Sequence, residues 1–588
     1  MFDKIFLLRN SLAGLLLCLR AATPAAASVL PRSSQTIRWV DCHENVPQPI
    51  ESALNVTGTS FNGTLPSTLF CGKMDVPMDY TKPFDAATNN ITIGFAMNRP
   101  VKSSGLIIYH AGGPGLDAAS QAWANALNLS SGAPFAEVQN FDFLAVNTRG
   151  IQFSTPLNCS SGVFFNDIPF AFPSSQTEYD QYQAAMKNFY SACTNNSTPA
   201  GIMQHVGTIE VIQDWDSVRA ALGYEKVSFA GVSYGTFVGM AYAAQFPQRV
   251  DRFVLDAAIP HGMPFQYMVT DQIAAANRLV LRADAFCLTD PTCPFHGQGN
   301  GSVVKAWDTL LGRAIAEPLP ALGCGPGKGC NSPVTPTDLR LGLTVLFRAN
   351  PDFPLFNIAL NASLHGDATL FAYQPLGDIR ESIVSPLLCS DFKIEDAQKT
   401  FAAFNNLSLN AQSSDPRQII YSQIGQFLLM CSVWPFSVPE PVTLPTTLTL
   451  MWMTSDFDLN LPTELTTFAW EQAPNSTLVI RHGDDHTSIL ATPGPATRAQ
   501  GVAMDFLRTG VMPLASSDEQ VTVISSGGTR GPVPGAYDEP TGAVAGDSSS
   551  VEDVPASGLS LGNAALRLRF APASYLATCI PLAACCWM

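Results

Sequence analysis

The stretch Gly231-Val232-Ser233-Tyr234-Gly235 decides the fold of this chain because of the segments that flank it. Residues 226–230 upstream are typical of a strand, and residues 236–246 downstream carry apolar side chains at helical spacing until Pro247. A Gly-x-Ser-x-Gly turn between a strand and a helix is a nucleophile elbow, since its glycines allow a tight turn. Such a turn lifts a hydroxyl above the sheet edge, so Ser233 is the candidate nucleophile.

The five-residue pattern is common by chance, and a glycine-rich loop is the first of two features that support it. Residues 105–109 are typical of a buried strand, and His110-Ala-Gly-Gly-Pro-Gly115 follows directly. The amide of Gly113 in such a loop can face the negative charge that develops on a carbonyl oxygen. The amide of Tyr234 would be the second donor. Taken alone, the loop is equally compatible with an ordinary Gly/Pro turn.

An acid and a histidine that follow two late strands are the second feature. Asp458 comes after the strand-like residues 446–453, and His486 comes after the strand-like residues 477–480. The order Ser, Asp, His is that of an α/β-hydrolase. In this arrangement the histidine takes the serine proton and the carboxylate orients the imidazole.

The chain resembles the secreted α/β-hydrolases of the tripeptidyl aminopeptidase and prolyl aminopeptidase type over residues 65–515. The matching segments are Gly112-Gly113-Pro114-Gly115, Phe141-Asp142, Arg149-Gly150, residues 231–236, Phe246-Pro247 with Arg249-Val250, Val254-Leu255-Asp256, residues 458–462, His486-Thr487 and residues 506–510 with Pro513. The resemblance implies an α/β fold with a mostly parallel sheet, flanking helices and an inserted helical cap. It also implies a triad of Ser233, Asp458 and His486 that cleaves short peptides from their N-terminus through an acyl-enzyme.

Neighbouring residues compete for two of these roles. Asp456 is an alternative to Asp458, although the spacing to the downstream proline favours Asp458, and His482 is an alternative to His486. A metal site over residues 482–486 is disfavoured, because a glycine interrupts any helix there and the His-Glu-x-x-His pattern is absent. We therefore expect no metal and no cofactor.

Three departures from the family pattern affect loops that would line the site. Leu116-Asp117-Ala118 follows the glycine loop, Asn147 replaces the Asp of Asp-x-Arg-Gly, and Asp485 replaces the glycine before the histidine. They remove no triad member, but they leave the substrate open. An esterase, lactone or amide hydrolase acting on a small metabolite is the second hypothesis. A non-catalytic binding protein with the same fold is the third.

The composition excludes one class of partner. The chain of 588 residues has a formal net charge of −16, whereas a protein that binds nucleic acid needs a basic face. The expected partner is a small peptide or a small-molecule acyl substrate. A hydrophobic content of 46% is sufficient for a large core that exceeds one ordinary domain.

The N-terminus and the glycosylation acceptors indicate secretion. Residues 1–27 are typical of a signal peptide, because Lys4 and Arg9 precede an apolar run and Ala25-Ala26-Ala27 offers a cleavage site. Asn-x-Ser/Thr acceptors occur at Asn55, Asn62, Asn90, Asn128, Asn158, Asn195, Asn196, Asn300, Asn361, Asn406 and Asn475.

The cysteines predict a disulfide framework. Ten of the 14 cysteines remain once Cys18 in the signal and Cys579, Cys585 and Cys586 in the tail are set aside. Sequence alone does not prove connectivity, but pairing nearest neighbours gives Cys42–Cys71, Cys159–Cys193, Cys287–Cys293, Cys324–Cys330 and Cys389–Cys431.

The spacing of the site residues predicts an insertion. Ser233 and Asp458 are 225 positions apart, whereas two further βα units need only on the order of 60–80 residues. We therefore expect a hydrolase core over residues 28–265 and 441–515, with a helical cap over 266–440. Residues 516–588 have a composition typical of disorder, and their apolar end resembles a glycosylphosphatidylinositol (GPI) attachment signal. Membrane contact is expected only if that signal is used.

Overall fold

The computed structural model describes residues 36–51, 54, 61–160, 164, 172–325, 330, 332–372, 379–420, 422–489 and 497–537. The predicted signal peptide, the acceptor Asn55 and the predicted GPI signal lie outside the described residues.

Within the described residues, 11 strands form one sheet in the order β1-β2-β3-β5-β4-β6-β7-β8-β9-β11-β10. The six strands from β5 to β9 in this order are parallel, and antiparallel strands extend both edges. The strand bounds are β1 (Arg38–Val40), β2 (Leu69–Val76), β3 (Ile91–Asn98), β4 (Leu106–His110), β5 (Asp142–Val146), β6 (Val227–Val232), β7 (Val250–Asp256), β8 (Met451–Ser455), β9 (Thr477–Arg481), β10 (Ser516–Ser517) and β11 (Val521–Ile524).

Helices cover both faces of the sheet, which explains why its central strands are apolar on both sides. Every residue of β4, β5, β6, β8 and β9 is buried. Trp123 and Leu507 pack on one face, and Trp215, Val238 and Leu465 pack on the other. These side chains come from α2 (Ala119–Ala126) and α15 (Arg498–Thr509), and from α5 (Thr208–Ala221), α6 (Tyr234–Gln245) and α14 (Thr463–Glu471), respectively. The short helix α1 (Gln48–Glu51) lies beside α2.

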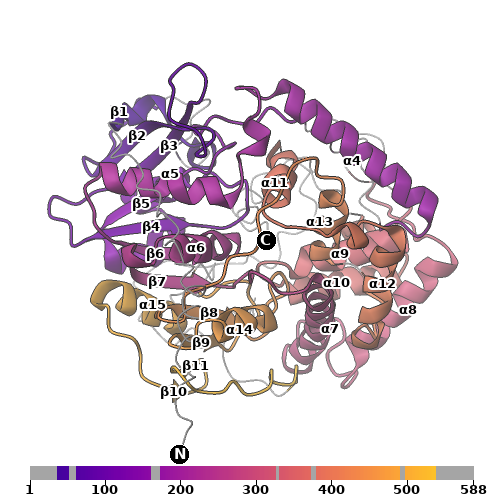
Figure 1. Ribbon diagram of the computed structural model, residues 1–588. Helices are drawn as coiled ribbons and strands as arrows, with labels where there is room; N and C mark the ends of the chain where they lie inside the picture. The colour runs from indigo at the N-terminus through magenta and orange to yellow at the C-terminus, as the bar shows by residue number, and fades with distance from the viewer. Residues whose placement is uncertain are drawn as a thin grey trace, which may run out of the picture.

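A second group of helices lies beyond the ends of strands β6 to β9 and forms a cap (Figure 1). The cap has a hydrophobic cluster of its own, which includes Trp307, Phe356 and Phe371. Its helices are α7 (Phe265–Thr289), α8 (Ser302–Ala316), α9 (Pro336–Phe347), α10 (Phe353–Leu364), α11 (Ile379–Cys389), α12 (Phe401–Ala411) and α13 (Gln423–Cys431).

Helix α4 (Gln176–Asn196), which lies in the predicted core, packs in the hydrophobic cluster of the sheet and also contacts the cap. The Tyr190 hydroxyl donates to the Met430 carbonyl at 3.1 Å, and Gln183 Nε2 donates to the Ser432 hydroxyl at 3.3 Å. Figure 1 shows α4 running along the cap beside α13. These contacts join the helix to residues more than 200 positions downstream, while its buried side chains belong to the same hydrophobic cluster as the sheet.

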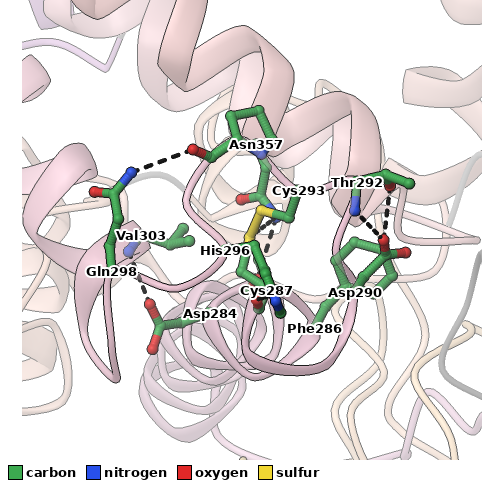
Figure 2. Close-up of a disulfide and its surroundings, with 12 residues drawn as sticks. Asp284, Phe286, Cys287, Asp290, Thr292, Cys293, His296, Gln298, Val303 and Asn357 are labelled. Carbon is green, nitrogen blue, oxygen red and sulfur yellow. Dashed lines mark hydrogen bonds between the residues drawn. A yellow bond between two sulfur atoms is a disulfide. The ribbon is translucent and has the colours of Figure 1, made fainter.

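The ten cysteines form five disulfides in the nearest-neighbour pairing. Figure 2 shows Cys287–Cys293, which closes the loop after α7. In the same region, the Asp284 carboxylate accepts the Val303 amide at 2.7 Å at the start of α8. These contacts hold the first two cap helices together.

Residues 516–537 form an ordered C-terminal strap, so the prediction of disorder from residue 516 was wrong for this segment. Strand β11 pairs antiparallel with β9, and Val521 and Val523 are buried. The strap continues to the cap, where the Tyr537 hydroxyl donates to Asp284 at 2.8 Å. The prediction failed because the local composition is rich in Gly, Ser and Pro, whereas the segment is ordered by pairing with strand β9 at the edge of the sheet.

None of the helices in the described ranges is long and apolar enough to cross a bilayer. Most of the described glycosylation acceptors are exposed, whereas Asn90 and Asn361 are half-buried. The exposed ones are Asn62, Asn128, Asn158, Asn195, Asn196, Asn300, Asn406 and Asn475.

Removing the strap should destabilise the fold. A chain that stops at Leu514 loses the burial of Val521 and Val523, and each buried valine contributes roughly 1.5–3 kcal/mol. We expect its free energy of unfolding to fall by about 3 kcal/mol or more, measured by urea unfolding, relative to a chain that stops at Tyr537. Equal stabilities of the two chains would show that the strap does not stabilise the core.

Candidate active site

The sequence 231–235 forms a strained turn between β6 and α6. Ser233 has φ 57° and ψ −127°, a combination rarely adopted by residues other than glycine. Its amide donates to the Asp256 carbonyl at 2.8 Å, and the Thr236 hydroxyl donates to the Ser233 carbonyl at 2.6 Å. Two hydrogen bonds therefore hold the turn that presents the Ser233 hydroxyl.

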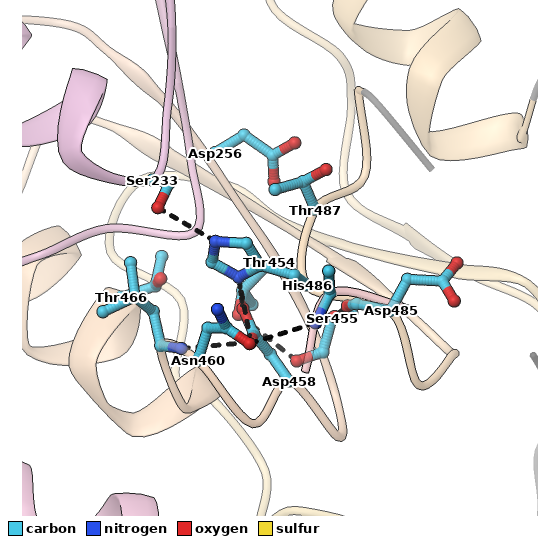
Figure 3. Close-up of polar contacts among 12 residues, drawn as sticks. Ser233, Asp256, Thr454, Ser455, Asp458, Asn460, Thr466, Asp485, His486 and Thr487 are labelled. Atoms are coloured by element: carbon cyan, nitrogen blue, oxygen red, sulfur yellow. Dashed lines mark hydrogen bonds and ion pairs between the residues drawn. The ribbon is translucent and has the colours of Figure 1, made fainter. Parts of the chain in front are cut away.

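The structure brings Ser233, His486 and Asp458 together at the carboxyl ends of three parallel strands. His486 Nε2 lies 2.9 Å from the Ser233 hydroxyl, and His486 Nδ1 lies 2.8 and 3.0 Å from the Asp458 carboxylate oxygens. Figure 3 shows the imidazole between the hydroxyl and the carboxylate. All three side chains are buried. These atoms form one continuous hydrogen-bonded chain from acid to hydroxyl.

The surroundings of Asp458 fix the tautomer of the histidine. Burial raises the pKa of Asp458, while His486 and the backbone amides of Leu461 and Asn460 oppose the shift. The Leu461 amide donates to Asp458 Oδ1 at 3.0 Å. With a carboxylate as acceptor, Nδ1 of His486 carries the proton, which leaves Nε2 as the acceptor for the Ser233 hydroxyl.

The alternative acid and base pair with each other instead. His482 Nδ1 lies 2.7 Å from the Asp456 carboxylate, and His482 Nε2 lies 3.0 Å from the Thr522 hydroxyl of the strap. Neither residue has a hydrogen bond to Ser233 among the described contacts. In the described part of the chain, no group of three or more His, Cys, Asp or Glu side chains could hold a metal ion.

The glycine loop approaches the nucleophile closely. A Cβ atom on Gly112 would lie 2.8 Å from the Ser233 Cβ and 2.7 Å from the Val232 carbonyl oxygen, and Gly112 has φ 96°. The predicted oxyanion donors flank this contact, because Gly113 is the next residue and Tyr234 is the first residue of α6. Only glycine fits at position 112.

His110 shapes the same loop. Its Nδ1 accepts the Gly112 amide at 3.1 Å, and its ring lies 5.5 Å from that of Trp215. Burial lowers the pKa of His110 to about 4, so the ring is neutral near pH 7 and can accept this hydrogen bond. This role of His110 was not predicted from the sequence.

Asp256, which the sequence places only in a segment that matches the family, anchors the loop that follows His486. Its Oδ2 accepts the amides of Ser488 at 2.7 Å and Ile489 at 2.6 Å. Burial raises its pKa to about 6, against the effect of these two amides. The available signal was an aspartate at the end of the strand that follows the elbow.

Asp391 was missed entirely because it lies in the predicted insertion. Its carboxylate accepts the Thr208 amide at 2.7 Å, the Thr208 hydroxyl at 2.7 Å and the Tyr234 hydroxyl. Burial raises its pKa to about 6. A cap residue therefore holds the side chain of the residue that follows the nucleophile.

An apolar recess lies where the cap meets the core. The Leu461 amide bonds to Asp458, and the Ile259 amide donates at 3.1 Å to Thr236, whose hydroxyl bonds to the Ser233 carbonyl. The recess is therefore adjacent to the site. Its lining residues are Ile259, Phe265, Met268, Phe392, Ile394, Ile424, Phe427, Leu428 and Leu461.

Replacing Gly112 by alanine should disable the elbow while leaving the fold intact. The new methyl group would displace Ser233 or the glycine loop, and a shift of about 1 Å at a reacting group lowers the rate roughly 100-fold. Gly262→Ala is the matched control, because Gly262 has φ 76° but no atom within 4 Å of an added Cβ. The measurement is kcat on a chromogenic ester. Similar kcat values for the two variants would contradict the close approach.

Asp256 should give stability a specific pH dependence. Its pKa is about 6 in the folded protein and near 3.8 when unperturbed, so the folded state holds a proton that the unfolded state releases between these values. The free energy of unfolding therefore decreases as pH rises through this window, by roughly 3 kcal/mol from this group. Urea unfolding from pH 4 to 7 should show a smaller decrease in Asp256→Asn. Parallel pH profiles would contradict the assignment.

Comparison with known proteins agrees with this architecture. Residues 105–293 match the alpha/beta hydrolase fold family, and the prediction of that fold is confirmed. Serine protease Hip1 of Mycobacterium tuberculosis is 30% identical over 300 residues, which cover 50% of this chain and 53% of that protein. A tripeptidyl aminopeptidase of Streptomyces coelicolor is 29% identical over 319 residues, which cover 51% of this chain and 52% of that protein.

The chain spans about half the length of the curated relatives it matches. The chain has the α/β-hydrolase fold, and the relatives to which it is similar include one named serine protease and one named tripeptidyl aminopeptidase.

Proposed function

We propose that this protein is a secreted serine exopeptidase that removes short peptides from the N-terminus of its substrate. The observation that carries the proposal is the unbroken hydrogen-bonded chain from Asp458 through His486 to the Ser233 hydroxyl. The preference for peptides rests on the relatives named serine protease and tripeptidyl aminopeptidase. The five disulfides support secretion, since such bonds persist in oxidising compartments.

The proposed reaction proceeds in two halves. The Ser233 oxygen attacks the scissile carbonyl carbon while its proton passes to His486 Nε2. The tetrahedral intermediate then expels the leaving amine, which takes that proton from His486, and an acyl-enzyme remains on Ser233. Water deprotonated by His486 releases the acyl group by the same route. Asp458 stabilises the imidazolium that forms in each half.

The charge that develops on the carbonyl oxygen would be stabilised by backbone amides. Tyr234 is at the N-terminus of α6, where amide groups lack intrahelical acceptors, and its side chain is held by Asp391. Gly113 would supply the second donor from the glycine loop. Pre-oriented donors of this kind are each worth roughly 3–4 kcal/mol of transition-state stabilisation.

A second candidate is an esterase that acts on a small acyl substrate. Attack by Ser233 on an ester carbonyl needs the same three side chains, and it needs no contact with an α-ammonium group. Both candidates use the same three residues and differ only in what the cap admits.

The test compares the wild-type protein with Ser233→Ala on three substrate types. These are peptidyl p-nitroanilides with a free N-terminus, the same compounds after N-acetylation, and short-chain p-nitrophenyl esters. The exopeptidase proposal predicts turnover of the free peptides and strong loss on acetylation. Turnover of esters alone would favour the esterase.

Ser233→Ala should lower kcat by at least roughly 10⁴-fold on any turned-over substrate, with little change in Tm, because the triad acts as one unit. A fluorophosphonate probe should label the wild-type protein and fail to label the variant. A folded wild-type protein that takes no label would support a non-catalytic binding protein instead.

A further inference from the structure

Arg282, on cap helix α7, reaches the loop that carries His486. Its Nε and Nη2 donate to the two carboxylate oxygens of Asp484 at 2.8 and 3.2 Å. Asp484 lies two positions before His486, and both side chains of the ion pair are buried. A bidentate pair of this kind fixes orientation as well as distance. The cap therefore determines the position of the histidine loop.

The same guanidinium also contacts the loop that carries Asp458. It lies over the ring of Phe457, 5.0 Å from the ring centroid, and Phe457 directly precedes Asp458. The Phe457 amide donates to the Gly483 carbonyl at 3.1 Å, which ties the two loops to each other. One cap side chain thus touches both loops of the proposed acid–base pair.

A backbone contact from the cap reinforces this arrangement. The His486 amide donates at 2.6 Å to the carbonyl of Ala349, a residue between α9 and α10 with φ 62°. The Ala349 amide donates at 3.1 Å to Asn460 of the acid loop. Arg282 Nη1 also donates to the Ala536 carbonyl of the strap at 3.1 Å. The cap, the strap and both catalytic loops therefore share one set of polar contacts.

We propose that Arg282 is a positioning residue that sets the placement of His486 relative to Asp458. The inference rests on the proposed serine hydrolase function and extends it to the cap. Replacing a buried ion pair by apolar residues of similar volume is often neutral or stabilising, so fold stability alone does not explain this pair. An apolar pair would fill the same space, but it would hold neither position 484 nor the Phe457 ring in a fixed orientation.

The decisive variant replaces both partners, Arg282→Met with Asp484→Leu, in the full-length protein. The single change Arg282→Met leaves a buried carboxylate without its guanidinium and should destabilise the fold, so it does not test positioning. In the double variant we expect a Tm close to that of the wild type. We expect kcat to fall roughly 10- to 100-fold while KM changes less than about threefold, since the histidine loop loses its fixed position.

Two further variants sharpen the test. Arg282→Lys keeps the charge but loses the planar bidentate contact, so kcat should be intermediate. Arg278→Met is the matched control, because Arg278 lies one turn earlier on α7 and pairs with Glu464 of α14 at 2.7 and 3.1 Å. That pair is partly exposed, and the hydrogen bonds described for its side chains join Arg278 and Glu464 to each other only. Its kcat should stay within about twofold of the wild type.

The rate of Ser233 labelling by a fluorophosphonate is the second readout, and it should fall in parallel with kcat. A folded double variant with kcat and labelling rate within about twofold of the wild type would overturn the proposal. Failure of the proposed function is distinguishable from this outcome, because Ser233→Ala would then retain turnover in an otherwise unaltered protein.

Discussion

The carboxylate of Asp458 is fully buried, and no guanidinium or ammonium group pairs with it among the described contacts. Its charge is stabilised by the His486 N–H and by backbone amides. The hydrogen bond that stabilises the ionised acid therefore also orients the histidine ring. The strands and the elbow around the site position the atoms of this interaction. The parallel strands bring the two loops to one sheet edge, and the elbow places the Ser233 hydroxyl at the free nitrogen of the ring.

The residues on either side of Asp458 explain why the cap matters to this interaction. Phe457 and Leu459 belong to the hydrophobic cluster of the cap, whereas Asp458 between them contacts His486. The apolar side chains on either side therefore anchor the acid loop in the cap, while the Asp458 carboxylate between them faces the core. Because Arg282 and Ala349 contact the histidine loop, the cap contributes to both sides of the acid–base pair. Under the proposed function, a change in cap packing would therefore shift the acid–base pair itself.

Much of the sheet and of the candidate site could be predicted because the signals are local. The elbow at Ser233 depends on five adjacent residues, and the strands before Asp458 and His486 are short apolar runs. The roles of Asp391, Arg282 and the strap could not be predicted, since the partners of Asp391 and Arg282 lie 157 and 202 positions away and those of the strap lie 40 and 253 positions away. Charged residues inside an insertion give no local indication of whether they will be exposed or buried against a distant loop.

The two Asp–His pairs show the limit of what residue spacing predicts about the site. Asp456 and His482 form a hydrogen bond as short as those of the triad, so the residue types alone do not separate the two pairs. The two pairs differ in the hydroxyl group that the histidine contacts. His486 meets Ser233 on a strained turn beside the glycine loop, whereas His482 meets Thr522 on a strand of the strap. Thr522 lies within a regular β-ladder and lacks a neighbouring elbow, so the second pair connects the strap to the loops of the candidate site, while the first pair contacts the proposed nucleophile.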